Sequence, residues 1–413
     1  MKQKLLILSL ALIGVLGMKA STASGSCGDN LTWVLDSYGK LAITGTGDMY
    51  NYDDDEENAA PWSSNRSEIQ SLSLPSGMTS IGKYAFIYCV NLTGNLVIPN
   101  TVTRIGESAF YGCEKFNGTL TLGTSVKTIE DEAFNDCIFT GTLTIPNSVD
   151  SIGSDAFSSN MFSGNLVIPN SVTALSSSAF YECKNFNGTL TLSENLKVIE
   201  DYTFDGCAFT GSLVIPNSVK SIEADAFADC NFDGTLTLGD SVTTIGNDAF
   251  DCAAFTGALV LPKTLTSLGL RALKSSKFTS ITSKAVTPPS LGANVFMSTQ
   301  TTTPVYVPAA GVDAYKIADG WKEFSNIDAI VVASGTLDGY DLSWVIDEDY
   351  NLSFTGTGTT IPNYASYTDA PWADYSASVA SLTIPETITG IGNDAFRKFT
   401  KLKTVTIHKM SQL

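Results

Sequence analysis

A phrase of 23 or 24 residues recurs through the middle of the chain, and it constrains the fold more than any other feature. Copies read GTLTIPNSVDSIGSDAF (141–157), GNLVIPNSVTALSSSAF (164–180) and GSLVIPNSVKSIEADAF (211–227). A fixed period of this length is typical of a solenoid, in which each unit forms one turn of a stacked coil. The phenylalanine that ends each copy, called here the landmark phenylalanine, recurs as Phe86, Phe110, Phe134, Phe157, Phe180, Phe204, Phe227 and Phe250.

Residues 142–163 show why one unit cannot fold alone. Each inward apolar side chain contributes roughly 1.5–3 kcal/mol when it is fully buried. Fixing the backbone of each residue costs about 1–2 kcal/mol, so the cost exceeds the gain within a single unit. Stacking must supply the rest. The apolar positions that recur in each clear copy are Leu143, Ile145, Val149, Ile152, Ala156, Phe157 and Phe162.

The local pattern of a unit predicts a strand, a corner and a turn. Leu143 and Ile145 alternate with Thr142 and Thr144, which is strand periodicity, and we expect such strands to form a parallel ladder between coils. Pro146 then ends the pairing because it lacks an N–H donor. The Asp, Glu or Ser before each AF pair is suited to cap a short helical turn that carries the landmark phenylalanine inward.

The pattern SVTxIGxxAFxxC, together with a strand reading LxIP, resembles the BspA-like leucine-rich repeat family of bacterial surface proteins. The resemblance covers eight clear coils, a weaker pair around Leu273 and Phe296, and one more coil at Phe396. We therefore expect an α/β solenoid of the leucine-rich-repeat type: a right-handed coil with a parallel β-ladder and short helical turns, capped by small β modules. Many coils have a phenylalanine where the family often has a leucine: Phe139, Phe162, Phe186, Phe209, Phe232 and Phe255.

Five segments are expected along the chain. Residues 1–23 have lysines, an apolar run from Leu5 to Leu16 and small residues up to Ala23, which is typical of a secretory signal peptide. The apolar run is shorter than the about 20 residues that span a bilayer, and no later segment is apolar enough. The remaining segments are an N-terminal β capping module (24–69), the repeat solenoid (70–278), degenerate repeats with a C-terminal cap (279–332), and a second capping module with a partial repeat (333–413).

Two features of the first module leave alternatives open. Cys27 is either a lipidated anchor or a buried structural residue, and the preceding Ser24, Gly25 and Ser26 lack the large aliphatic residue of a usual lipoprotein signal. The acidic run 53–57 either binds calcium or forms a solvated loop. It lacks the alternating ligands and the glycine of a known calcium loop, which favours the solvated loop.

The end of the repeat region and the second module also carry predictions. Residues 304–330 read as a strand followed by an amphipathic helix with Tyr315, Ile317 and Trp321. From Ser334 the opening module recurs, with Trp344 in the place of Trp33. The last segment, LKTVTIHKMSQL (402–413), is expected to contain a strand with an exposed edge. That edge packs on the first domain, pairs with another chain, or is a natural end protected by lysines.

Cysteines recur once per coil, three residues after the landmark phenylalanine. Metal ligands must converge from different directions, so this spacing argues against a metal site. Disulfides between adjacent coils are not excluded by distance, but parallel side chains that point into a core favour free, packed thiols. Asn160 occupies one cysteine position and Cys252 falls one place early; the regular members are Cys89, Cys113, Cys137, Cys183, Cys207 and Cys230.

A second set of positions flanks the strand leucine and is expected to face solvent. These residues form an uncharged, Thr-rich surface, and leucine-rich-repeat proteins usually bind partners on such a surface. Thr and Val also suit strands, so the pattern is equally explained by β-propensity alone. The candidate binding residues are Thr119, Thr121, Thr142, Thr144, Asn165, Val167, Thr189, Thr191, Ser212, Val214, Thr235 and Thr237.

Nothing in the sequence indicates an enzyme, a cofactor or a metal site. The only histidine, His408, lies near the end of the chain, so a Ser–His or Cys–His arrangement is disfavoured. Neighbouring acids such as Glu130, Asp131 and Glu132 recur at the same coil position, which indicates structure. Loss of the signal peptide would take the net charge from −18 to about −21, and such acidity disfavours nucleic acid and anionic lipid.

These observations predict an exported bacterial protein, either secreted or at the cell surface, that binds another protein through its solenoid. The resemblance implies an adhesin, with host extracellular-matrix or plasma proteins such as fibronectin or fibrinogen as partners. The alternative is a structural envelope protein or a carbohydrate-binding protein that has no host protein partner.

Overall fold

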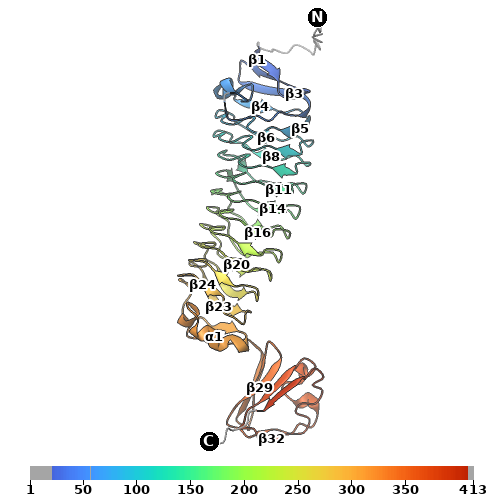
Figure 1. Cartoon of the computed structure of the whole chain (residues 1–413), viewed down its shortest axis with the longest axis vertical. Coiled ribbons are helices and arrows are strands. Elements are labelled where there is room, and N and C mark those ends of the chain that lie inside the picture. Colours follow the sequence, from blue (N-terminus) through green and yellow to red (C-terminus); the bar gives the residue numbers. More distant parts are fainter. Residues whose placement is uncertain (1–20, 56, 408–413) are drawn as a thin grey trace. The chain divides into compact units, whose positions relative to one another are not determined.

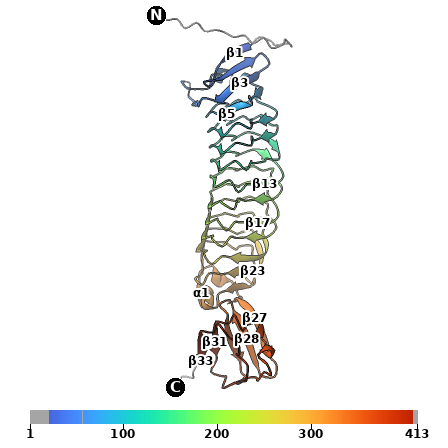
Figure 2. The ribbon, with the colours of Figure 1, turned by 90° about the vertical axis from the view of Figure 1, so that its right-hand side faces the viewer.

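The computed structural model describes residues 21–55 and 57–407. The chain forms two compact units, Met1–Phe186 and Asn187–Leu413, and each is described by itself. Within each unit, successive coils lie side by side as stacked ribbons (Figure 1, Figure 2). The solenoid predicted from the repeat is therefore confirmed, while the handedness of the coil, the capping role of the terminal modules and the domain boundaries stay predictions.

The first unit opens with an antiparallel strand arrangement. β1 (Ser21–Ser26), β2 (Leu31–Asp36) and β3 (Lys40–Asp48) pair in that order, and Gly39 takes the left-handed φ of 77° that the turn after β2 requires. β3 then pairs in parallel with β4 (Ser71–Ser73) and β5 (Gly77–Ile81). The 3-10 turn η1 (Ser63–Glu68) lies between β3 and β4 in the sequence. Trp62, just before η1, is fully buried and its indole N–H donates to the Ala85 carbonyl at 2.7 Å.

The continuous parallel ladder of this unit lies on the isoleucine of each coil, one segment later than the sequence predicted. β5 is followed in order by β7 (Arg104–Ile105), β9 (Thr128–Ile129), β11 (Ser151–Ile152) and β14 (Ala174–Leu175). In β7, β9, β11 and β14 the apolar residue is buried and the residue before it is at least partly exposed.

Pairing at the strand leucines is intermittent, which differs from the expected ladder there. β6 (Leu96–Val97) pairs with β8 (Leu120–Thr121), and β10 (Thr140–Gly141) pairs with β12 (Met161–Phe162), while β13 (Leu166–Val167) follows. Residues 142–146 have the expected alternation of buried and exposed side chains but form no assigned strand. Alternation therefore predicted the direction of the side chains correctly, and it did not predict the backbone pairing.

The turn before each landmark phenylalanine is a chain of tight turns and not a helix. The residue that precedes the AF pair has a positive φ, as in Ser108 (49°) and Asp155 (53°). Along this turn, successive N–H groups donate in alternation to a carbonyl of the same coil and to a carbonyl of the next coil. Ala109 N–H bonds to Gly106 O at 3.2 Å, whereas Phe110 N–H bonds to Ala133 O at 2.9 Å. The expected helix cap is therefore replaced by a left-handed residue.

The landmark phenylalanines form a stacked column in each unit, as the repeat predicted. Ring centroids lie 4.9 Å apart between Phe86 and Phe110 and 5.4 Å apart between Phe110 and Phe134, with nearly parallel planes. A second column, formed by the phenylalanines that replace the family's leucine, runs beside it; Phe139 and Phe162 are 6.4 Å apart at 12°.

The second unit continues with the same kind of coil. β15 (Leu190–Thr191) comes first, β17 (Leu213–Val214) pairs with β19 (Leu236–Thr237), and the isoleucine ladder runs through β16 (Val198–Ile199), β18 (Ser221–Ile222), β20 (Thr244–Ile245), β22 (Ser267–Leu268) and β24 (Ser290–Leu291). A further sheet has the order β21 (Thr256–Leu261), β23 (Lys277–Ser283), β25 (Val305–Val307) and β26 (Ile327–Ala329).

The helix predicted within residues 304–330 is present, but one of its expected core residues is not buried. β25 leads through η2 (Ala309–Gly311) to α1 (Val312–Ile317) and η3 (Trp321–Glu323). Tyr315 and Trp321 are fully buried, and the Tyr315 hydroxyl bonds to Ala285 O at 2.9 Å. Ile317 is 78 % exposed. The expectation that Ile317 lies on the apolar face is wrong, because Ile317 follows the buried Tyr315 by two residues and so points to the opposite side of the helix.

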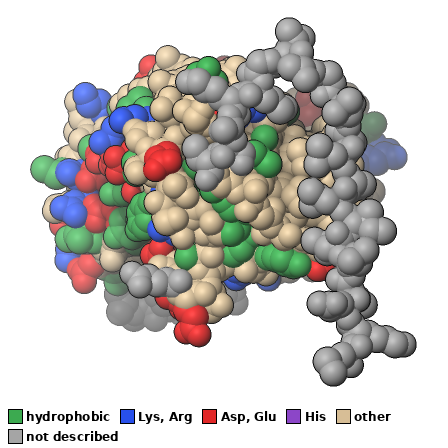
Figure 3. All heavy atoms as spheres, turned by 90° about the horizontal axis from the view of Figure 1, so that it is seen from above, with side chains coloured by type: hydrophobic (Ala, Val, Ile, Leu, Met, Phe, Trp, Pro, Cys, Tyr) green, Lys and Arg blue, Asp and Glu red, His purple; other side chains and the backbone are tan. Residues whose placement is uncertain are grey.

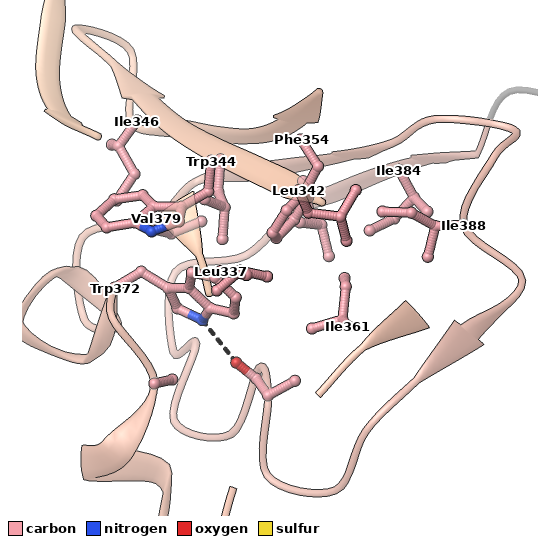
Figure 4. Packing of buried hydrophobic residues seen from close by; sticks show 14 residues of the cluster. Leu337, Leu342, Trp344, Ile346, Phe354, Ile361, Trp372, Val379, Ile384 and Ile388 are labelled. Atoms are coloured by element: carbon pink, nitrogen blue, oxygen red, sulfur yellow. Dashed lines mark hydrogen bonds between the residues drawn. The ribbon is translucent and has the colours of Figure 1, made fainter. Parts of the chain in front are cut away.

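The last segment repeats the opening arrangement. Its sheet has the order β27 (Val331–Leu337), β28 (Leu342–Asp347), β29 (Asn351–Gly356), β31 (Ser381–Ile384) and β33 (Thr404–Ile407), and β30 (Thr360–Ile361) pairs with β32 (Gly390–Ile391). The short turns η4 (Tyr367–Asp369) and η5 (Ala373–Tyr375) flank Trp372. Figure 4 shows Trp372 beneath Trp344 and Val379, with its N–H donating to Ala395 O at 2.7 Å, as Trp62 does to Ala85.

Candidate binding face

The candidate binding residues all lie on the solvent side of their coils. The leucines between them are buried, and Leu120, Leu143 and Leu166 are at most 4 % exposed. Because side chains alternate along an extended segment, the residues before and after each leucine point outward. We call these residues the strand face. All are exposed: Thr119, Thr121, Thr142, Thr144, Asn165 and Val167 in the first unit, and Thr189, Thr191, Ser212, Val214, Thr235 and Thr237 in the second.

The strand face combines hydroxyl groups with exposed methyl groups and carries no charge. The position after the leucine is either threonine or valine, and Val97 (61 %), Val167 (54 %) and Val214 (57 %) are unusually exposed for an aliphatic residue. Neutral polar and apolar atoms in regular rows suit contact with a protein surface better than with a polyanion.

Some polar residues of the strand face also serve the fold. The Asn95 amide oxygen accepts the Thr119 N–H at 2.9 Å, and the Ser212 hydroxyl accepts the Thr235 N–H at 2.9 Å. These bonds link one coil to the next. Asn95 and Ser212, each the first residue of its row, therefore have a structural role that β-propensity alone did not predict.

A hollow of about 490 Å³ opens on the strand face of the first unit. It lies where β8 and the following coil are not joined as a strand pair. Thr119, Thr121, Thr142 and Thr144 line it, together with Pro146. Its lining is rich in hydroxyl groups and lacks charged side chains, so it can accept neutral hydrogen-bonding groups of a partner.

A charged row crosses the isoleucine ladder of the first unit and was not predicted from the sequence. Lys83 Nζ lies 2.8 Å from Glu107 Oε2, and Arg104 Nη1 lies 2.8 Å from Glu130 Oε1. Hydrogen bonds from Lys83 and the Tyr84 hydroxyl hold the pKa of Glu107 below its usual value. The signal in the sequence was a lysine or arginine close to the ladder isoleucine of one coil and an acid close to that of the next coil. These pairs neutralise one another, so the row offers little net charge to a ligand.

Charges are interspersed on the part of the surface seen from the end that bears β1 to β3. Acidic and basic side chains alternate along one flank there, with hydrophobic side chains between them (Figure 3). A broad patch of one sign does not appear in this view, which agrees with the paired charges of the row.

The recurring acids have structural roles, as their repetition predicted. The Asp131 carboxylate accepts the Ser154 N–H at 2.8 Å, and Glu132 accepts the Ser108 hydroxyl at 2.8 Å. In the second unit, Asp201 accepts the Ala224 N–H at 2.8 Å. Each acid fastens its coil to a neighbouring coil.

The cysteines are free, and those at the regular position are buried, as predicted. The Cys137 thiol donates to Phe110 O at 3.2 Å, and the Cys183 thiol donates to Phe157 O at 3.1 Å. Burial raises the pKa of Cys183 to about 12, so it is not a nucleophile at neutral pH. Cys252, one place early in the sequence, is exposed, and its hydrogen bond to Asp229 raises its pKa to about 11.

Cys27 is fully buried, which fits the structural alternative. Its N–H donates to Leu31 O at 3.0 Å, and burial raises its pKa to about 11. In the acidic run, the Asp55 carboxylate accepts the N–H groups of Glu57 and Asn58 at 3.1 and 2.9 Å. This closes a local turn. His408 and Glu56 lie outside the described residues.

Within residues 21–55 and 57–407, no group of three or more His, Cys, Asp or Glu side chains is arranged to hold a metal ion. No helix in the same part of the chain has the length and apolar character needed to cross a membrane.

A sequence model described as the BspA type leucine-rich repeat region, in six copies, matches residues 64–187, 187–303 and 372–412. The chain belongs to this family. Membership agrees with the stacked coils and establishes a leucine-rich repeat protein.

Solved structures that match this chain include leucine-rich repeat proteins from two bacteria and a pneumococcal antigen. One from Bacteroides ovatus is 19 % identical, covers 91 % of this chain and 93 % of its own, and has a TM-score of 0.50. One from Eubacterium ventriosum is 22 % identical, covers 95 % and 98 %, and has a TM-score of 0.46. The pneumococcal vaccine antigen PcpA is 16 % identical over 76 % of this chain and 100 % of its own, with a TM-score of 0.27. Comparison with curated proteins gives no match.

Proposed function

We propose that the protein is a secreted or cell-surface adhesin of a bacterium, and that its strand face binds another protein. Family membership supports an extended binding scaffold, and the recurrence of exposed, uncharged residues at fixed coil positions supports the strand face as the contact surface. The observation that carries the proposal is that all twelve candidate residues are exposed although the leucine between each pair of them is buried.

Host extracellular-matrix or plasma proteins are the proposed partners, because the resemblance to surface proteins of this kind implies them. No catalytic role is proposed, since the recurring acids and thiols are engaged in bonds between coils. A carbohydrate-binding or envelope role is the second candidate, and the hydroxyl-lined hollow of about 490 Å³ favours it over a purely structural role.

Surface-plasmon resonance over immobilised fibronectin, fibrinogen and a panel of glycans tests the proposal. The double variant Thr121→Lys/Thr144→Lys places two charges on the strand face. Neither of these threonine hydroxyls has a hydrogen-bond partner among the described residues. We expect it to weaken binding to a matrix protein at least about tenfold, or about 1.4 kcal/mol.

The matched control is Thr103→Lys/Thr173→Lys, which adds the same charge at exposed threonines elsewhere on the coils. We expect it to change affinity by less than about twofold. Binding to glycans alone would support the second candidate. Absence of binding to every matrix protein at micromolar concentration would contradict the adhesin.

A further inference from the structure

Strand β33 exposes two apolar residues that occupy core positions of a coil. It pairs in parallel with β31 and, among residues 21–55 and 57–407, forms the outer edge of its sheet. Val405 and Ile407 stand opposite Leu382 and Ile384, which are 3 % and 2 % exposed. Val405 is 51 % exposed and Ile407 is 65 % exposed. An edge strand of this kind presents unpaired N–H and C=O groups to solvent.

The first unit shows what covers the same two positions elsewhere in this chain. Its sequence SLSLP…LVIP (71–99) parallels SLTIP…VTI (381–407), so that Leu96 and Ile98 correspond to Val405 and Ile407. Leu96 and Ile98 are only 3 % and 1 % exposed. Their N–H groups donate to Thr119 O and Thr121 O of the next coil, each at 2.9 Å. An extended segment with alternating apolar residues therefore fits this kind of edge.

The charge beside β33 is opposite to that of the chain as a whole. All 42 acidic residues precede residue 395, whereas the last nineteen residues carry five basic ones and no acid. Lys401 and Lys403 are exposed, and the described part of the chain gives neither of them an ion pair. A partner segment with acidic residues at its ends would be attracted to this edge.

We propose that the outer edge of β33, with Lys401 and Lys403 beside it, docks an extended acidic segment of another protein, which adds to the sheet as its next strand. Strand addition supplies backbone hydrogen bonds, and Val405 and Ile407 supply apolar contacts. A second copy of this edge is a poorer fit because it would bring two lysine-bearing segments together, and like charges repel. A free polyanion would use the lysines but not the apolar residues.

Fluorescence polarisation with the full chain and labelled peptides tests the proposal. The probe DEGTLTLGDE carries residues 118–123 of the covering coil between acidic ends, and KKGTLTLGKK carries them between basic ends. We expect the acidic peptide to bind at least about tenfold more tightly than the basic one, a difference of about 1.4 kcal/mol. Ile407→Asp should abolish binding, while the control Ile317→Asp, at an exposed isoleucine on α1, should not.

A charge reversal keeps the test decisive even where Ile407→Asp disturbs folding. Lys401→Glu/Lys403→Glu should reverse the preference toward the basic peptide, and Lys263→Glu/Lys316→Glu, at exposed lysines elsewhere, should leave it unchanged. The proposal is overturned if neither peptide binds the wild-type chain, if the preference survives the reversal, or if sedimentation shows a dimer that Ile407→Asp abolishes. The proposal is also overturned if neither peptide binds, while heparin binds the wild-type chain and Lys401→Glu/Lys403→Glu loses that binding.

Discussion

Asn160 shows what the cysteine position of each coil does. The thiols at this position donate to the carbonyl of a phenylalanine one coil earlier, and the Asn160 amide makes the same contact with Phe134 O at 2.8 Å. It also bonds to Phe157 O at 3.0 Å and accepts the Phe139 N–H at 3.1 Å. A donor at this position therefore links two coils, although the equivalent Ala253 in the coil of Phe250 has none, and asparagine satisfies more backbone groups than cysteine does.

Asn160→Ala should lower the free energy of unfolding by about 1–3 kcal/mol, because it leaves buried backbone groups without partners. Asn160→Cys should lower it by less, since a thiol restores the bond to Phe134 O. Urea denaturation followed by circular dichroism measures both. Equal losses of stability for the two variants would show that the hydrogen bond of this side chain does not contribute to stability and that only its volume matters.

At the scale of the element, the turn before the landmark phenylalanine depends on a left-handed residue. Ser178 has a φ of 58° and is only partly exposed. A β-branched residue is strained at such a φ, whereas glycine is not. Ser178→Val should therefore be less stable than Ser178→Gly by about 1–2 kcal/mol in the same denaturation assay. If the two variants unfold at the same urea concentration, the turn does not depend on this conformation.

The repeat predicted the inward and outward direction of side chains well, because burial follows from apolar periodicity alone. It placed the landmark phenylalanines in a column and the strand face on the surface. It did not predict the ladder at the isoleucines, since a two-residue strand such as β11 has too few residues to show alternation. Nor did it predict the left-handed turns, because Asp, Ser and Glu suit helix caps and left-handed turns equally well. The partners of Lys83 and Arg104 lie one coil away, and that distance is fixed only by stacking.

At the scale of the whole molecule, stacking crowds carboxylates from neighbouring coils. Burial raises the pKa of Asp155, and the nearby Glu132 and Asp131 raise it further. Burial also raises the pKa values of Glu200 and Asp225. A carboxyl whose pKa is raised on folding stabilises the fold when protonated, and that stability is lost as the pH rises through the folded pKa.

These carboxyls should therefore add stability as the pH falls from 7 toward the usual carboxyl pKa of about 4. Below that range it should decrease, because the lowered pKa of Glu107 reflects ion-pair and hydrogen-bond stability that is lost when the group is protonated. Thermal unfolding from pH 3 to 8 measures this. The isosteric Asp155→Asn should raise Tm at pH 7 and have little effect at pH 4. A Tm that falls steadily from pH 7 to 5 would contradict the inference that stacking raises the pKa values of these carboxyl groups.

The strand face is the surface that we propose binds a partner. Hydrogen–deuterium exchange of the full chain, with and without a bound matrix protein, tests this most directly. We predict slower exchange over residues 117–122, 140–145 and 163–168, and unchanged exchange over 101–105 and 171–175 on the isoleucine ladder. Protection confined to the ladder segments, with residues 117–122, 140–145 and 163–168 unchanged, would contradict it.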